Sequence, residues 1–229
     1  MIINMILSDP NIYSCPHCES LISRLNWMSA NTFDGILYSD NKAIYPHCPE
    51  LPDLTKCYNC NSFLWLSKIC KIELPENFRK EAELKYNEAE FLSTEDLFKA
   101  METGFIEKDE IFFVRFCIWH SYNDRIRAGN GNLFKDQTDE IRWKENLEEL
   151  KKLFDPNNQY HILLTAEIER NLNNFNVAIL LLNSVNDKNL QMIKLQIIEA
   201  CNNSISKVFE LESTQINNID REDSESLED

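Results

Sequence analysis

The stretches "SCPHC" (residues 14–18) and "KCYNC" (residues 56–60) each place two thiols three positions apart. A Cys-x-x-Cys pair suits a tight turn that points both sulfurs at one metal ion, and two such turns complete a tetrahedral site. The 38 residues between Cys18 and Cys57 exceed the common spacing of about 15–20. Closing a loop costs only ~0.6 kcal/mol more for each doubling of its length, so the two pairs can still meet. The sequence therefore predicts a Zn²⁺ site formed by Cys15, Cys18, Cys57 and Cys60.

A zinc ion held by four thiolates has no open position for water or substrate, so we expect this zinc to be structural. Two alternatives remain open at this point. His47 or Cys48 in "YPHC" could replace one of the ligands, because both lie nine to ten residues before Cys57. A thioredoxin-like redox role would need a strand followed by a helix around the thiol pair, and "CPHC" lacks that context.

The residues around the two thiol pairs have β-type patterning. "GILYSDNKAIYP" (35–46) predicts two short strands around an Asp40–Asn41 turn, and "SFLWLSKI" (62–69) predicts a further apolar strand. Phe63 and Trp65 are then expected to pack on that hairpin. We assign residues 11–72 to a small zinc-ribbon-like domain.

From about residue 76 the apolar period becomes 3.6, which is typical of amphipathic helices. The prolines, glycines and capping residues divide this part into at least six helices. Ser93 or Thr94 is expected to cap the first, Thr138 a later one, and Pro156 to open the next at its first position. We assign residues 76–212 to an all-α domain and the acidic tail 213–229 to a disordered segment, because the tail has too few large apolar residues to offset ordering entropy. The expected fold class is mainly α.

The charge of the chain disfavours several classes of partner. The formal net charge is −15, and residues 1–70 contribute only −2 because they carry four bases and six acids. Neither part has the basic surplus that binds phosphates, so we expect no nucleic-acid partner and no attachment to an anionic membrane. The first residues lack the features of a signal peptide, no apolar run approaches the ~20 residues that span a bilayer, and eight cysteines would stay reduced in the cytosol. We expect a soluble, cytoplasmic protein.

The order of these features resembles an uncharacterised family of bacterial proteins that join an N-terminal zinc-ribbon-like module to a tetratricopeptide-like helical region. Besides "CPHC", the resemblance is carried by "SANTFDGILYSD" (29–40), "PELPDLTKCYNCNSFLW" (49–65), "FCIWHSYNDRIR" (116–127) and "AEIERNLNNFNVAILLL" (166–182). It covers most of residues 13–185 and implies an architecture, since the family has no established activity. Two features depart from the pattern: Asp34 stands where glycine is expected, and "YPHC" adds a thiol and an imidazole where apolar residues are usual.

The segment "NNFNVA" has the turn pattern of a tetratricopeptide repeat. Asn173 takes the place of the turn residue, Phe175 that of the aromatic and Ala178 that of the small packing residue. Asparagine substitutes well for glycine in a left-handed turn, and alanine lets two helices approach closely. A solenoid needs about three repeats, and three periods are not evident here. Both a repeat array and an irregular tetratricopeptide-like bundle remain possible from the sequence.

The segment "WHSYNDRIR" (119–127) is the candidate for catalytic chemistry. On a helix His120, Asp124 and Arg127 share one face, so His120 and Asp124 could form an acid–base pair. The simpler interpretation is structural: Asp124 pairs with Arg127, His120 caps a polar seam, and Trp119 lies in the core. We favour the structural interpretation, because His120 has no nucleophile or metal partner in view.

These expectations together indicate a zinc-stapled protein-interaction protein without catalytic activity. Its acidic character favours a basic protein or peptide partner and a salt-sensitive association. An enzyme with a polar site around His120 and Asp124 is the first alternative. A nucleic-acid-binding zinc ribbon is the second.

Overall fold

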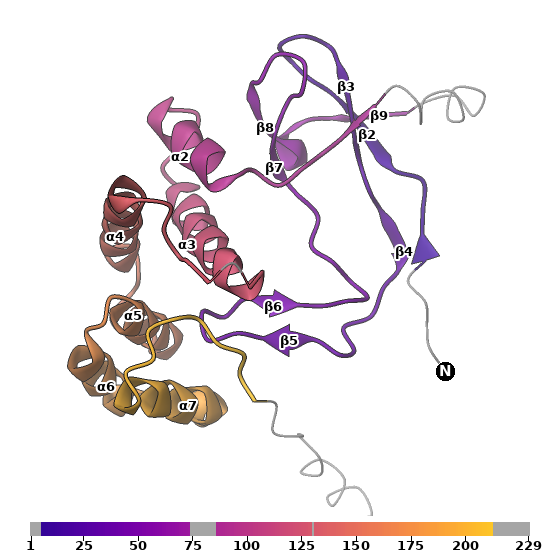
Figure 1. Ribbon diagram of the computed structural model, residues 1–229. Helices are drawn as coiled ribbons and strands as arrows, with labels where there is room; N and C mark the ends of the chain where they lie inside the picture. The colour runs from indigo at the N-terminus through magenta and orange to yellow at the C-terminus, as the bar shows by residue number, and fades with distance from the viewer. Residues whose placement is uncertain (1–5, 74–85, 130, 213–229) are drawn as a thin grey trace, which may run out of the picture.

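The computed structural model of the chain describes residues 6–73, 86–129 and 131–212. Within these ranges short strands form the first part of the chain and α-helices the rest (Figure 1). The expected order, a small β module followed by helices, is confirmed. The boundary between the two predicted domains remains a prediction, and the acidic tail 213–229 lies outside the described residues.

Two antiparallel β-hairpins carry the Cys-x-x-Cys stretches at their turns. The first joins β2 (Asn11–Ser14) to β3 (Leu21–Arg24), and the second joins β7 (Leu54–Lys56) to β8 (Phe63–Trp65). Short strands extend the first hairpin into a four-stranded sheet: β9 (Lys71–Ile72) pairs with β2, and β10 (Asn87–Glu88) pairs with β3. The strand expected at 62–69 is therefore present as β8, which is followed by the 3₁₀ turn η1 (Leu66–Lys68).

Two more two-stranded pairs complete the β part. β1 (Ile6–Leu7) pairs with β4 (Trp27–Ser29), and β5 (Ile36–Leu37) pairs with β6 (Ala43–Ile44). The hairpin expected at 35–46 is thus confirmed, with Asn41 in the left-handed region at φ 63°. Asp34 has φ 57°, which gives a physical reason why glycine is expected at that position.

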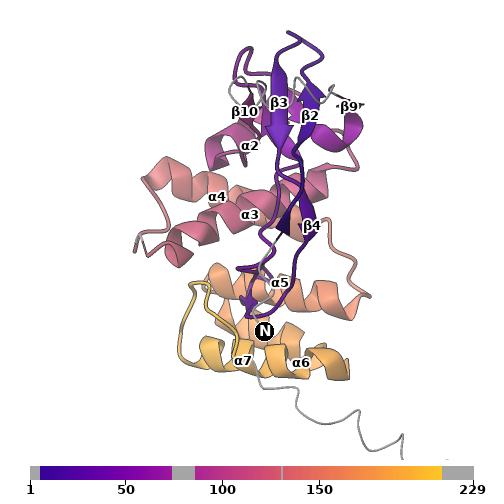
Figure 2. The ribbon, with the colours of Figure 1, turned by 90° about the vertical axis from the view of Figure 1, so that its right-hand side faces the viewer.

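The helical part of the described chain consists of six α-helices and a short 3₁₀ helix. They are α2 (Thr94–Glu102), α3 (Ile111–Arg127), α4 (Gln137–Lys151), α5 (Gln159–Asn171), α6 (Phe175–Ser184), η2 (Lys188–Leu190) and α7 (Gln191–Asn202). In both ribbon views α2 lies beside the two hairpins that carry the thiol pairs, while α6 and α7 lie at the opposite end of the molecule, near the β5–β6 hairpin (Figure 2). Contacts join α2 to α3, α3 to α4, α5 to α6 and α6 to α7.

The helix starts agree only partly with the sequence prediction. Ser93 caps α2 as expected, because its side chain accepts from the backbone N–H of Asp96. The predictions for α4 and α5 are wrong. Asp136 caps α4 in place of Thr138, and Asn158 caps α5 two residues beyond Pro156. In both cases an Asp or Asn side chain near the expected residue accepts hydrogen bonds from the free backbone N–H groups at the helix start. Asp and Asn are among the most favourable N-cap residues.

One hydrophobic core joins the second hairpin to the helices. Leu54 and Trp65 belong to the same buried cluster as residues of α2, α3, α4 and α5. The Phe63 ring lies 6.0 Å from Phe105, and the Trp65 ring lies 5.6 Å from Phe113. The expectation that Phe63 and Trp65 pack on the 35–46 hairpin is therefore wrong.

The physical reason is the alternation of side chains along β8. Leu64 faces the small core between the two thiol-bearing hairpins, together with Tyr13 and Ile22. Its two neighbours Phe63 and Trp65 must then point to the opposite face, and the helices cover that face. All three residues of β8 are buried.

Candidate functional site

The two thiol turns are built alike, residue by residue. In the first, the backbone N–H of Cys15 donates to Ser20 O at 2.9 Å, and Glu19 N–H donates to Cys15 O at 2.9 Å with Glu19 at φ 62°. In the second, Cys57 N–H donates to Ser62 O at 2.9 Å, and Asn61 N–H donates to Cys57 O at 2.9 Å with Asn61 at φ 58°. Each turn thus reverses the chain at a left-handed residue and places both thiols on its inner side.

The four sulfurs meet between these turns. The Sγ atoms of Cys15 and Cys60 are 3.6 Å apart, as are those of Cys18 and Cys57. All four sulfurs lie within 4.8 Å of one another. A tetrahedron with metal–sulfur bonds of about 2.3 Å has sulfurs about 3.8 Å apart, so the arrangement fits one four-coordinate metal ion. These four cysteines could therefore hold a metal ion.

Hydrogen-bond donors surround the sulfurs and favour the thiolate form. The Ser20 hydroxyl lies 3.1 Å from the sulfurs of both Cys18 and Cys57. Hydrogen bonds from Ser20 and Asn59 lower the pKa of Cys18 to about 5. Burial acts to raise the pKa of Cys57, but bonds from Ser20 and from the backbone N–H groups of Cys60 and Asn59 outweigh it and lower the pKa. A thiolate is the form that binds metal.

Cys15 differs because burial raises the pKa of its thiol to about 12. It is fully buried, and it accepts backbone N–H bonds from His17 and Cys18. A divalent cation at the centre of the quartet would favour the thiolate here as well, since a coordinating thiol is deprotonated. The donor set therefore fits a metal ion.

The alternative ligands lie elsewhere. The sulfur cluster does not include Cys48, and His47 Nε2 lies 3.9 Å from Asp34 Oδ2 on the loop that enters the β5–β6 hairpin. The context of "CPHC" is a strand, a turn and a second strand. The structure thus brings together the four predicted cysteines and leaves His47 and Cys48 outside the cluster.

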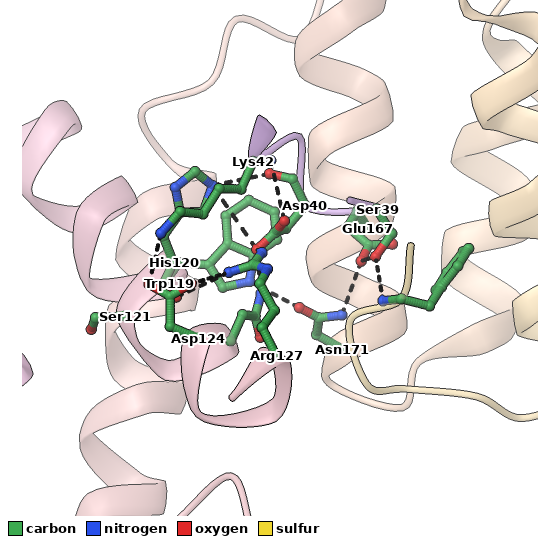
Figure 3. Close-up of polar contacts among 12 residues, drawn as sticks. Ser39, Asp40, Lys42, Trp119, His120, Ser121, Asp124, Arg127, Glu167 and Asn171 are labelled. Carbon is green, nitrogen blue, oxygen red and sulfur yellow. Dashed lines mark hydrogen bonds and ion pairs between the residues drawn. The ribbon is translucent and has the colours of Figure 1, made fainter. Parts of the chain in front are cut away.

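A second cluster of polar residues lies where the β5–β6 hairpin meets α3 (Figure 3). Asp40 is fully buried and receives hydrogen bonds from Arg127 Nη2 and, at 2.8 Å, from Asn123 Nδ2. Arg127 Nη1 also donates to Asp124 Oδ1 at 2.6 Å, and Lys42 Nζ donates to Asp124 Oδ2 at 2.7 Å. The hairpin is therefore held to α3 by a network of charged and polar side chains.

The residues proposed for acid–base chemistry are used inside this network. His120 Nε2 lies 3.1 Å from Asp40 O, and burial lowers the pKa of His120 further than Asp40 raises it. Burial acts to raise the pKa of Asp40, but the charge that His120 carries when it is protonated, the charge of Arg127 and the hydrogen bonds from Arg127 and Asn123 outweigh it and lower the pKa. A neutral imidazole facing a carbonyl, together with an Asp124 carboxylate that accepts from two cations, supports the structural interpretation. Trp119 is fully buried, as that interpretation expects.

The network continues on the other side of the hairpin into α5. Ser39 Oγ donates to Glu167 Oε1 at 2.7 Å, and Arg170 Nε donates to Glu167 Oε2 at 2.7 Å. The side chains of Glu167 and Arg170 are fully buried. Asn171 Nδ2 donates to Glu167 Oε1 at 3.2 Å, and Trp119 Nε1 donates to Asn171 Oδ1 at 2.8 Å (Figure 3). Ser39 and Asp40 therefore bind two different helices through adjacent side chains.

Sequence reasoning missed the partners that the hairpin supplies. The helical segment 119–127 stands out by its own pattern, but Asp40 reads as an ordinary turn residue and Ser39 carries no signal of burial. Glu167 and Arg170 read as exposed charges on a helix. One available signal is that the stretches 29–40, 116–127 and 166–182, which carry the family resemblance, contain all of these residues.

Comparison of the chain with protein-family models, with curated proteins and with solved structures found no match. None of the helices among the described residues has the length and apolar character needed to span a membrane.

Proposed function

We propose that this chain is a zinc-stapled protein-interaction module, an adaptor without catalytic activity. The observation that carries the proposal is the sulfur quartet at the ends of two matched hairpins. Four thiolates would saturate a Zn²⁺ ion and leave no position for water or substrate. The ion would then act as a structural link that holds the β7–β8 hairpin, and through Trp65 the helical core, against the first hairpin.

The helical part supplies the contact surface in this proposal, as an irregular tetratricopeptide-like array. Asn173 has φ 66° at the α5–α6 turn, and Ala178 is fully buried where the two helices meet. Both features suit a tetratricopeptide-like helix pair. Apolar side chains stay exposed on the outermost helices, among them Leu180 (71%) on α6 and Leu195 (56%) on α7. In this proposal these side chains contribute to the contact surface.

The partner in this proposal is a protein or peptide, with a basic segment favoured by the net charge of −15. Charge attraction speeds encounter and weakens with ionic strength, because ions screen it over about 8 Å at physiological salt. The proposed place of action is the cytoplasm, where free thiols persist.

The metal part of the proposal is tested by elemental analysis of the purified chain. We expect about one zinc per chain. Zinc removal by a chelator should lower the thermal midpoint, and adding zinc back should restore it. A metal-free chain that is fully folded, or a bound ion with an exchangeable water, would refute the structural zinc.

The interaction part is tested by affinity capture from the native host in low and high salt. We expect a protein that is retained at low salt and released as salt rises. The Asp124→Asn variant should capture the same protein, because Asp124 is half-exposed and serves only the hairpin network. Retention of the chain on DNA or heparin would favour nucleic-acid binding, and we expect none.

A further inference from the structure

The segment that follows α7 crosses the buried network without forming a helix, and it bends at Lys207. We call residues 205–212 the C-terminal strap. Its side chains Val208 and Leu211 are each 7% exposed, and Phe209 packs on the cluster formed by α5, α6 and α7. An antiparallel bridge pairs Glu210 with Tyr38, next to the end of β5. The strap therefore runs between the β5–β6 hairpin and α5 (Figure 1).

Buried side chains of α5 bind the main chain at the first half of the strap. Arg170 Nη1 donates to Ile205 O at 2.5 Å and to Lys207 O at 3.0 Å. Asn171 Nδ2 donates to Ser206 O, which lies between them, at 3.0 Å. Arg170 is held in place by its buried partner Glu167, so its remaining N–H groups point at the strap carbonyls.

The hairpin binds the main chain at the second half of the strap. Ser39 N–H donates to Phe209 O at 2.9 Å, and Phe209 N–H donates to Ser39 Oγ at 3.3 Å. Leu211 N–H then donates to Leu37 O at 2.8 Å. This is the pattern by which an extended peptide adds to the edge of a sheet: main-chain bonds provide affinity, and alternate side chains provide selectivity.

The buried ion pair between Glu167 and Arg170 favours a recognition surface over ordinary apolar packing. Burying charge is costly, and apolar residues of similar size would fill the same volume at equal or better stability. Here the pair prepares donors for successive carbonyls of an extended chain, a task that apolar residues cannot perform. The contacts are to main-chain atoms, so they would serve any extended segment with suitable apolar side chains.

We infer that the surface formed by β5, Ser39 and α5 is a binding site for an extended peptide, and that the strap occupies it in cis. The partner is an extended segment with apolar side chains at the positions of Val208, Phe209 and Leu211. It replaces the strap in trans and pairs with Leu37 and Ser39. This inference rests on the proposed interaction function and names the surface that performs it.

Because the strap competes in cis, a partner needs enough affinity to displace it. A tethered segment has an effective concentration of about a millimolar, so it competes strongly with a free peptide. For a strap sequence whose own intrinsic Kd is about 10 µM, a free peptide would therefore bind the intact chain about 100-fold more weakly than a chain without the strap contact. Weakening the strap should remove this competition.

The test uses the full-length, zinc-loaded chain and a fluorescein-labelled peptide with the sequence of residues 204–212, SISKVFELE. Fluorescence anisotropy compares the wild type with the double variant Val208→Asp, Leu211→Asp, whose own strap no longer fits the surface. We expect saturable binding to the variant and at least about 30-fold weaker binding to the wild type. A control peptide with the same two aspartates should bind neither chain. A folded variant that ignores both peptides, or binds both equally, would overturn the inference.

Hydrogen exchange on the wild type provides a test that does not depend on the variant folding. The amides of Phe209 and Leu211 should exchange by local opening, faster than the amides of α5 that lie beneath them. Exchange of the strap only together with α5 would mean that the strap is a permanent part of the core and would refute the inference. A host partner captured equally by the wild type and the strap variant would place the contact on another surface. The inference would then fail while the interaction function stands.

Discussion

Asp40 and Asp124 both bind the guanidinium of Arg127, but one carboxylate is buried and the other is partly exposed. They are therefore a matched pair for mutation. The side chain of Asp40 is fully buried and that of Asp124 is 42% exposed, while Arg127 between them is 5% exposed. The changes Asp40→Asn and Asp124→Asn alter the same single atom. Any difference between them therefore reports the environment and not the chemistry of the substitution.

The expected magnitudes differ several-fold. Asp40→Asn removes the buried charge that Arg127 and Asn123 both bind, and breaking a buried pair by removing one partner costs about 3–5 kcal/mol. Asp124→Asn removes the more exposed partner, which is worth about 0–1 kcal/mol. Because about 1.4 kcal/mol is a tenfold change in an equilibrium constant, Asp40→Asn should lower the folding constant by a factor of roughly a hundred to several thousand.

Urea unfolding of the zinc-loaded proteins, followed by far-UV circular dichroism, measures both changes. We expect the Asp40→Asn midpoint to fall clearly below that of the wild type and the Asp124→Asn midpoint to stay close to it. Equal losses for the two variants would show that the network is not organised around a buried Asp40. A loss of less than about 1 kcal/mol for Asp40→Asn would show that solvent reaches the site in the folded state.

Three further predictions concern the metal ligands, the buried imidazole and the α5–α6 turn. Cys57→Ser should lose the bound zinc while Cys48→Ser keeps it, which elemental analysis measures; loss of zinc in both would return the "YPHC" cysteine to the ligand set. His120 has a lowered pKa in the fold and takes up a proton more readily when unfolded, so its contribution to stability is present above the ordinary pKa near 6.5 and is lost as pH falls below it. Urea midpoints between pH 7 and pH 5 should therefore fall less steeply for His120→Gln than for the wild type, by up to about 1.4 kcal/mol per pH unit, and equal slopes would contradict a buried neutral ring. Asn173 has φ 66°, so Asn173→Ala should lower stability by about 1 kcal/mol while Asn173→Gly should not, as thermal melts of the two variants would show; equal melting temperatures would exclude conformational strain at this turn.

Local patterns in the sequence account for the cysteine cluster and for most of the elements. The spacing within each thiol pair and the turn-forming residues after it are enough to specify the Cys-x-x-Cys turn, whatever the rest of the chain does. The same holds for the hairpin around Asp40 and for the left-handed Asn173. These features depend on interactions within a few residues, so a single sequence reveals them. The exact residue at which a helix starts is harder to predict, because neighbouring residues such as Asp136 and Thr138 compete for the N-cap position.

The surface on which the 35–46 hairpin packs could not be predicted from its sequence. It lies between the two thiol pairs, so it was expected beneath Phe63 and Trp65 in the ribbon. The structure places those two aromatics on the helices and the hairpin against α3, α5 and the strap. The hairpin pattern specifies that two strands pair. It contains nothing about which distant surface will cover them.

The sequence alone determined that four thiols can close around one ion and that helices follow, because both depend on residue type at short, regular spacing. Only the tertiary structure decided that Ser39 and Asp40 are buried and that Arg170, paired with Glu167, binds the chain's last described segment. A charged residue on a helix or in a turn looks the same in sequence whether water or a counter-ion faces it. Its distant partner, 87 residues away for Asp40 and Arg127 and 35 residues away for Arg170 and Ile205, is supplied by packing and determines its role.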